Sequence, residues 1–418
     1  MTAVAVKLKN PVSDKEISMN GNGKQTQTPT SQRIQIARER LIQVYNKLNE
    51  LIIGHEEINK LILVTLIANE NAVLISPPGC AKTYTFEILS KLLNARFYKY
   101  LLTRFTTDIE LFGVYDIKLL VEQGKLVRKW SKIIEADIIF LDEIFKANSA
   151  ILNSLLSLLQ ERILYDPYTG QSLKVKALSI FGASNEVPTE EELQALYDRF
   201  VVRIFFKYLE SDDLILRALE ARWLNNSEIE PLANIEDVKV LHEFAMTIIR
   251  SEIKGLDKFI KVYHTSAIPF IKSLRSKGIV VSDRTIIEKL PKLIASACAL
   301  FGIKYDIIIN SVIDFLPYLA RDQSEFEQIR KTIYEDLGEI AQLHEKLEKA
   351  RIAIKSGNLE LAEKLLNDVI NFDMNRIAQK PWLKNRVSAI LTEAQRMLQK
   401  VQELRATLQK LAESSNSE

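Results

Sequence analysis

The sequence is poor in cysteine and has no long hydrophobic run. Its 418 residues include two cysteines, Cys80 and Cys298, which is too few for a disulfide framework and suits a reducing cytosol. No apolar stretch approaches the roughly 20 residues that cross a bilayer, and the first residues are polar, unlike a signal sequence. We therefore expect a cytoplasmic protein without membrane insertion.

The chain also lacks a large net charge of either sign. It has 56 basic and 54 acidic residues, which gives a formal charge of +2. A global electrostatic attraction to nucleic acid or to a membrane surface is therefore not expected, although local basic patches are compatible with this composition. The length predicts two or three domains, each with an adequate core.

The most informative segment covers residues 76–83 and reads Ser-Pro-Pro-Gly-Cys-Ala-Lys-Thr. It follows an apolar run at 72–75 and leads into a helical pattern at 82–93. The start of a helix carries unpaired N–H groups and a partial positive charge, so it can bind a polyphosphate. We expect Lys82 to contact the terminal phosphates and Thr83 to ligate Mg²⁺.

This segment departs from the usual phosphate-binding loop at two positions. Ser76 and Ala81 stand where the general pattern has glycine, while Gly79 is retained. Glycine lets the backbone approach phosphate closely and adopt positive φ, so Ala81, which adds only a methyl group, is tolerable if its φ is negative. Cys80 is interpreted as a small loop residue, with a redox switch as the less favoured alternative.

A second acidic motif reads Ile-Ile-Phe-Leu-Asp-Glu over residues 138–143. Asp142 would hold the same Mg²⁺, and Glu143 would polarise the attacking water. Either motif alone could arise by chance in a strand–turn–helix. Their combination predicts an ATP hydrolase.

Strands are predicted at 72–75, 97–103, 137–142, 178–184 and 201–206, alternating with helices at 82–93, 147–162 and 190–199. This alternation predicts a parallel sheet covered on both faces, with nucleotide at the carboxyl ends of the strands. Residues 113–129 and 164–175 resemble hairpins inserted into this core. They are either surface decoration or loops that face a substrate.

The rest of the chain is predicted to be helical. We expect a disordered leader at 1–30, an α/β core at 31–207, a helical domain at 208–318, a helical bundle at 319–413 and a tail at 414–418. The last third carries three amphipathic patterns, the final one at heptad spacing. An intramolecular antiparallel bundle is favoured, and a dimeric coiled coil is the alternative.

Three more polar residues are candidates for the site. Asn185 ends a strand, where it could orient water or a γ-phosphate or simply cap a turn. Arg199 lies at a helix end and could serve a neighbouring subunit's nucleotide, whereas Arg203, on an apolar strand, is expected to be structural. Arg284 begins a helix and could couple the helical domain to the nucleotide, with a surface salt bridge as the alternative.

The order of these motifs resembles the AAA+ ATPases of the MoxR family, in particular the RavA-type branch, over roughly residues 45–305. The resemblance is carried by Ile-Ile-Gly-His at 52–55, Pro-Pro-Gly-Cys-Ala-Lys-Thr at 77–83, Leu-Thr-Arg-Phe-Thr-Thr at 102–107, Phe-Leu-Asp-Glu-Ile-Phe-Lys-Ala at 140–147, Ala-Ile-Leu-Asn-Ser-Leu-Leu at 150–156, Ala-Ser-Asn-Glu-Val-Pro at 183–188, Leu-Tyr-Asp-Arg at 196–199 and Val-Ser-Asp-Arg at 281–284.

The resemblance implies a role for each of these positions. Lys82 and Thr83 would form the Walker A pair, with Pro78, Gly79, Cys80 and Ala81 in the same nucleotide-binding loop, and Asp142 and Glu143 would form the Walker B pair. Asn185 would be sensor 1, Arg199 the arginine finger and Arg284 sensor 2. Residues Ile52, Ile53 and Gly54 would contact adenine.

The resemblance also implies an αβα core with strand order 5-1-4-3-2, a helical lid, a hexameric ring and a hairpin that faces the ring pore. We expect Mg²⁺-ATP to bind between subunits, with Lys82, Thr83 and Arg284 from one and Arg199 from the next. Hydrolysis would remodel or mature a partner protein, by family similarity one with a von Willebrand factor A domain. A nucleic-acid motor and a nucleotide-dependent scaffold with little turnover are the alternatives.

Overall fold

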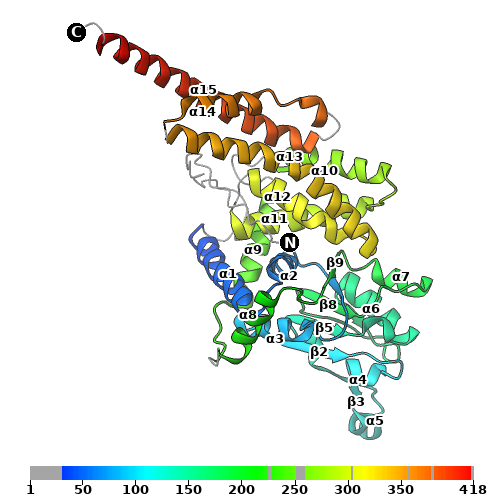
Figure 1. Ribbon diagram of the computed structural model, residues 1–418. Helices are drawn as coiled ribbons and strands as arrows, with labels where there is room; N and C mark the ends of the chain where they lie inside the picture. The colour runs from blue at the N-terminus through cyan, green and yellow to red at the C-terminus, as the bar shows by residue number, and fades with distance from the viewer. Residues whose placement is uncertain are drawn as a thin grey trace, which may run out of the picture.

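The computed structural model describes residues 31–224, 228–250, 259–302, 305–355, 357–377 and 381–415. The predicted leader at 1–30 and the last three residues of the predicted tail lie outside these ranges. Figure 1 shows an α/β part, a layer of helices beside it and a long helical extension that ends in α15.

A parallel five-stranded sheet lies at the centre of the α/β part. Its strands are β1 (Ala72–Ile75), β2 (Phe97–Leu101), β5 (Ile138–Asp142), β8 (Ser179–Ser184) and β9 (Val202–Phe205), in the order β2-β5-β8-β1-β9. The five predicted strands are therefore present, with ends shifted by two residues at most. Counted along the chain among these five strands alone, the order from the β9 edge is 5-1-4-3-2.

The register of the strands determines which residues meet at each edge of the sheet. Ile75 pairs with Ser184 and with Phe205, and Leu101 pairs with Asp142. The residues that follow these positions therefore gather at the carboxyl edge. The amino ends of the same strands, including Ala72 and its partner Val202, form the opposite edge.

Helices cover both faces of the sheet: α2 (Glu56–Ile67), α3 (Lys82–Leu92), α6 (Ser149–Glu161) and α7 (Glu191–Tyr197). The ring of Phe86 on α3 lies 5.0 Å from that of Phe140 on β5 and 4.5 Å from that of Phe181 on β8. Burial of these aromatic side chains stabilises the layered core, since each removes a large apolar area from water.

The first insertion differs from its prediction. The strands β3 (Gly113–Tyr115) and β4 (Arg128–Trp130) pair antiparallel, but a short helix α5 (Ile117–Gln123) joins them, and α4 (Asp108–Phe112) precedes them. Helix α5 ends at Gly124, which is left-handed, and Asp116 caps its start by accepting from the N–H of Lys118 and Leu119. These local caps stabilise a helix between the two strands of the predicted hairpin.

The second insertion is the predicted hairpin. Strands β6 (Ile163–Tyr165) and β7 (Ser172–Lys174) pair antiparallel around a turn in which Asp166 accepts from Tyr168 N–H and Thr169 Oγ1. The two insertions touch, because Tyr115 donates to Asp166 Oδ1 over 2.7 Å.

The helical layer contains α8 (Asp212–Trp223), α9 (Ile235–Ile249), α10 (Phe259–Ser276), α11 (Leu290–Phe301) and α12 (Tyr305–Phe315). A π-helical turn at Thr285–Lys289 leads directly into α11. The first helix of the chain, α1 (Ser31–Leu51), packs against this layer: Arg38 Nε donates to the Ala299 carbonyl over 2.8 Å, and the Tyr45 and Phe301 rings lie 5.7 Å apart. The sequence predicts that α1 belongs to the α/β core, although it packs against the helical layer. The predicted domain limits therefore remain predictions.

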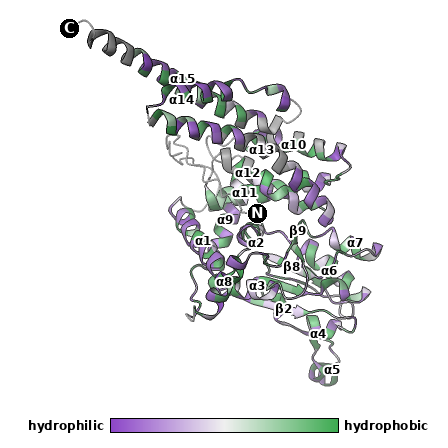
Figure 2. Cartoon of the chain, in the orientation of Figure 1, coloured by the Kyte–Doolittle hydropathy of each residue, from purple (hydrophilic) through white to green (hydrophobic). Residues whose placement is uncertain are grey.

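The last third forms an antiparallel bundle of α13 (Gln323–Lys355), α14 (Leu359–Ile370) and α15 (Pro381–Ser415). Lys346 pairs with Asp368, and Glu363 pairs with Arg405, as expected for helices that reverse direction at each connection. Figure 2 shows hydrophilic and hydrophobic residues alternating along α14 and α15. The predicted bundle is thus present, and α15 continues to Ser415, into the predicted tail.

Across the described ranges, no helix is both long and apolar enough to cross a membrane.

Candidate functional site

The loop at residues 76–83 connects the carboxyl end of β1 to α3. Gly79 has a φ of 84° and Ala81 a φ of 56°, so Ala81 does not have the negative φ at which alanine would be tolerated without strain. A left-handed alanine costs about 1–2 kcal/mol, and such strain persists where the surroundings fix the backbone. Within the described residues no hydrogen bond reaches the backbone N–H groups of residues 79–83, so they are open to an anion.

Lys82 is the first residue of α3 and is buried, with 9% of its surface exposed. Its Nζ lies 3.3 Å from the Ser76 carbonyl, 3.5 Å from the Ser184 carbonyl and 3.3 Å from Asn185 Oδ1. All three acceptors are neutral. A buried ammonium without a carboxylate partner is costly, and an anionic ligand would relieve that cost.

Ser76, which replaces the usual glycine, fits the loop through its backbone. It is buried, its N–H donates to the Ser184 carbonyl over 3.1 Å, and its hydroxyl donates to the Pro77 carbonyl. Cys80 is a buried free thiol. These observations fit the interpretation of Cys80 as a small loop residue.

Asn185 and Glu143 meet beside Lys82. Asn185 Nδ2 donates to Glu143 Oε1 over 2.9 Å, and Lys146 Nζ lies 3.2 Å from Glu143 Oε2. Glu143 is left-handed, with a φ of 53°, and its N–H donates to Asp142 Oδ1. Lys82, Asn185 and Glu143 are therefore linked by hydrogen bonds at the carboxyl edge of the sheet.

A magnesium ion fits this edge only together with phosphate. Thr83 is the second residue of α3 and Asp142 the last of β5; both are half-buried and, in the described part of the chain, make no direct hydrogen bond with each other. No group of three or more His, Cys, Asp or Glu among the described residues could hold a metal. One hydroxyl and one carboxylate suit Mg²⁺, which usually keeps water and phosphate ligands.

The predicted adenine-binding residues pack against the segment that follows β9. Ile52 and Ile53 are buried, and Gly54 has a φ of 79°. This positive φ favours glycine at position 54, and an added Cβ would also displace the Leu209 side chain, whose Cδ2 would lie 2.5 Å away. Close by in sequence, the Tyr208 hydroxyl donates to the Pro78 carbonyl over 3.0 Å and so ties this segment to the phosphate loop.

Tyr208, Leu209 and Lys146 were not predicted from the sequence. The position of Tyr208 could have indicated its role, because it lies shortly after β9, as Asn185 lies after β8 and Glu143 after β5. Lys146 lies three residues after Glu143, the spacing of neighbours on a helical turn. Leu209 gives no such signal.

The two predicted arginines lie at the other edge of the sheet. Arg199 and Arg284 line one cavity of about 540 Å³ together with Asn71 and Val201, which flank the amino ends of β1 and β9. The four residues of β1 separate this edge from the phosphate loop by about 13 Å. The prediction that Lys82 and Arg284 of the same chain contact one nucleotide is therefore wrong, because the two residues lie at opposite edges of the sheet.

The environments of the three arginines differ. Arg199 is half-buried, and its Nε has no hydrogen-bond partner among the described residues. Arg284 Nε donates to Glu288 Oε2 over 3.4 Å. Arg203 is buried, donates to the Leu319 and Ala320 carbonyls and pairs with Asp198, so the structural interpretation of this residue is confirmed.

Comparison with known proteins gives a consistent result. Residues 39–243 match a family model described as the MoxR domain in the MoxR-vWA-beta-propeller ternary systems. Two uncharacterized proteins of Methanocaldococcus jannaschii are similar to this chain. One is 38% identical over 248 residues, which cover 58% of this chain and 62% of the relative. The other is 35% identical over 249 residues, which cover 59% of this chain and 61% of the relative. The chain thus spans about three fifths of the length of these curated relatives.

A structural protein of Acidianus two-tailed virus is 26% identical over 255 residues, 56% of this chain and 40% of the viral protein. A solved structure from Cytophaga hutchinsonii, described as a candidate ATPase, superposes with a TM-score of 0.55 at 17% identity over 73% of this chain and 96% of that one. At this identity the superposition shows a shared fold alone. Residues 39–243 are therefore similar to a MoxR domain, and the parallel five-stranded sheet with its flanking helices fits an AAA+ αβα fold.

Proposed function

We propose that the protein is a Mg²⁺-dependent ATP hydrolase. The observation that carries this proposal is the hydrogen-bonded set of Lys82, Asn185 and Glu143 beside five open N–H groups. Lys82 and the N–H groups bind the β- and γ-phosphates. Glu143, oriented by Asn185, accepts a proton from the attacking water.

Thr83 and Asp142 are the residues that hold Mg²⁺ in this proposal. The ion, when bound, neutralises negative charge that develops on the phosphates. The chain supplies only part of its coordination, so metal and nucleotide are expected to bind together.

We place the nucleotide between two subunits. The cavity that contains Arg199 and Arg284 is lined by seven basic and three acidic residues, so it would attract a phosphate. It lies at the edge opposite the chain's own phosphate loop and would serve a neighbour, with Lys82 and Thr83 from one subunit and both arginines from the next. Contact between unlike edges is heterologous and forms a ring when the rotation between subunits closes; we propose a closed ring of six subunits.

The ring is proposed to remodel or mature a partner protein. The matching family model is named for systems in which a MoxR domain occurs with a vWA protein, which supports a partner with a von Willebrand factor A domain. Membership of the RavA-type branch and a cytoplasmic location remain predictions of the same kind.

The proposal is tested by turnover and binding measured on the same samples. Glu143→Gln keeps the shape and hydrogen bonding of the side chain but removes its basicity, so hydrolysis should fall at least about 100-fold while ATP affinity stays within about threefold. The exposed Glu50→Gln is the matched control and should hydrolyse ATP at the wild-type rate. Normal turnover by Glu143→Gln would refute the assignment, and stable nucleotide binding without turnover by the wild type would favour the scaffold alternative.

A further inference from the structure

Glu70 lies at the junction of the sheet and the helical layer. It precedes β1 by two residues, follows the left-handed Asn69, and is 4% exposed. Its carboxylate accepts from Lys289 Nζ over 2.9 and 3.1 Å and from Lys292 Nζ over 3.2 Å. Both lysines belong to the helical layer, so this buried carboxylate joins the two parts of the molecule.

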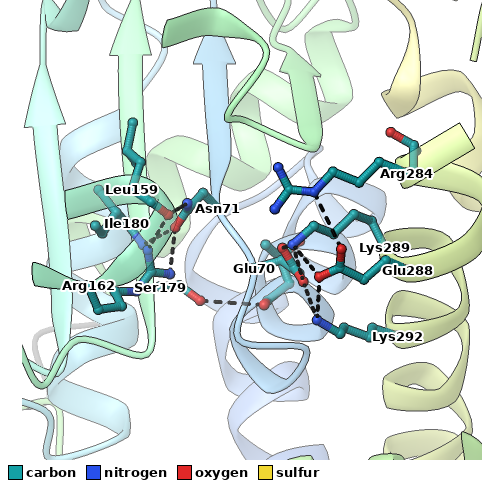
Figure 3. A network of polar contacts seen from close by, with 12 residues as sticks. Glu70, Asn71, Leu159, Arg162, Ser179, Ile180, Arg284, Glu288, Lys289 and Lys292 are labelled. Carbon is teal, nitrogen blue, oxygen red and sulfur yellow. Dashed lines mark hydrogen bonds and ion pairs between the residues drawn. The ribbon is translucent and has the colours of Figure 1, made fainter. Parts of the chain in front are cut away.

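The same lysines lead to Arg284. Glu288 Oε1 lies 3.2 Å from Lys289 Nζ and 3.3 Å from Lys292 Nζ, and Glu288 Oε2 accepts from Arg284 Nε. Burial would raise the pKa of Glu288, but the two lysines outweigh it and lower that pKa to about 2. Figure 3 shows the result: Arg284 reaches from the helical layer toward the sheet, beside the ion pairs centred on Glu70.

The core end of this network is fixed by the next residue, Asn71. Its Nδ2 donates to the Leu159 carbonyl, and its Oδ1 accepts from Arg162 and from Ile180 N–H. These contacts, drawn in Figure 3, hold the start of β1 against α6 and β8. Glu70 is therefore attached to a rigid part of the sheet.

The helical end has an unusual backbone. The π-helical turn Thr285–Lys289 begins one residue after Arg284 and contains both Glu288 and Lys289. Such turns add one residue to a helix, change the direction of the side chains around them, and are frequent at functional sites. Here the turn holds Lys289, which contacts Glu70, and Glu288, which contacts Arg284.

We infer that Glu70 is a positioning residue: through Lys289, Lys292 and Glu288 it holds Arg284 in the cavity shared with Arg199. This inference rests on the proposed function, because Arg284 matters there only when a neighbouring subunit's phosphate enters the cavity. A purely structural ion pair would affect stability without an effect specific to the neighbour's site.

Glu70→Gln tests the inference. The amide keeps the shape but loses the charge that holds two lysines, so turnover should fall about 10- to 100-fold through misplacement of Arg284, with ATP affinity of the variant's own phosphate loop unchanged. The matched control is Glu135→Gln, which also removes a carboxylate bridging two cations, Arg96 and Lys176, at an exposed position outside the cavity. It should keep wild-type turnover.

Mixing of subunits separates positioning from damage to the fold. A Glu70→Gln subunit has an intact phosphate loop, and a Glu143→Gln subunit has intact arginines. In rings assembled at random from equal amounts of both, about a quarter of the junctions combine that loop with those arginines, so these junctions should be active. If Glu70→Gln folds poorly, the exposed Glu288→Gln removes the next link and should show the same rescue. Turnover at the wild-type rate by both variants would overturn the inference but not the proposed function, and so would mixed rings that assemble and stay inactive. Absence of turnover in the wild type would overturn both the inference and the proposed function.

Discussion

Asn185 donates its side-chain amide to Glu143 over 2.9 Å and accepts from Lys82 through the oxygen of the same amide. One neutral group thus fixes the orientation of both a carboxylate and an ammonium. Because a general base acts only when it is correctly placed, this contact links the phosphate-binding and water-activating parts of the proposed site.

Replacement of Asn185 by alanine should lower the rate of hydrolysis more than the affinity for ATP. Among the described residues, Glu143 would keep only Lys146 as a side-chain partner, so we expect kcat to fall about 10- to 100-fold with KM within about threefold. Steady-state kinetics measures both. Asn367→Ala, at an exposed position on α14, is the control, and an equal loss in both variants would contradict the role of Asn185.

Ala81→Gly should stabilise the chain. Relief of the left-handed alanine should raise the free energy of unfolding by about 1 kcal/mol, as measured by chemical denaturation. The same substitution at Ala218, inside α8, should lower it by about 1 kcal/mol. A loss of stability in Ala81→Gly would show that the strain at this position is not real.

Arg199→Ala and Arg284→Ala should stop turnover without weakening the binding of ATP to dilute, unassembled chains. Both side chains lie at the edge opposite the chain's own phosphate loop. Calorimetry under dissociating conditions checks this expectation, with Lys82→Ala as the variant that should lose binding. Weaker ATP binding by dissociated Arg284→Ala would place this arginine in its own chain's site.

Arg128 and Asp166 should make the two insertions sensitive to acid. The Arg128 side chain is 1% exposed, its Nε lies 3.6 Å from Asp166 Oδ2, and its Nη2 donates to the Tyr115 hydroxyl. Burial would raise the pKa of Asp166, but hydrogen bonds from Tyr115, Tyr168 and Thr169 and the charge of Arg128 hold it below the ordinary 3.8. The stabilisation is therefore complete above pH 3.8 and is lost as the pH falls through the lower, folded-state pKa.

Asp166→Asn should cost about 1–3 kcal/mol at neutral pH, because the buried Arg128 guanidinium loses one of its two carboxylate partners among the described residues and keeps Asp108. Denaturation at a series of pH values should show a flatter acid dependence in this variant than in the wild type. Asp213→Asn, at the exposed start of α8, should leave the acid dependence unchanged. Identical acid profiles for wild type and Asp166→Asn would contradict the assignment.

Much of the site could be predicted because it lies where strands end. Glu143 and Asn185 directly follow strands, and Lys82 follows the loop after β1; neighbouring parallel strands bring such positions together. Local rules do not extend to the Glu70 network, since Glu70 and Lys289 are 219 residues apart and meet only through packing of the helical layer. The left-handed φ of Ala81 could not be predicted either, because the surrounding loop overrides the intrinsic preference of alanine.

The placement of Arg284 shows the same limit. Its motif indicated a helix start near the nucleotide, but the motif carries no information on which edge of the sheet the helical layer covers. The packing of α1 against α9 and α11 is part of that arrangement and joins segments about 200 residues or more apart. Such long-range packing depends on the shape of whole domains.

The most direct test of a nucleotide held between subunits is an experimental structure of the assembled Glu143→Gln chain with Mg²⁺ and ATP. We predict that the γ-phosphate contacts Lys82 of one subunit and Arg199 and Arg284 of its neighbour. A γ-phosphate bound by residues of one chain alone, with Arg199 remote from every adjoining site, would contradict this account.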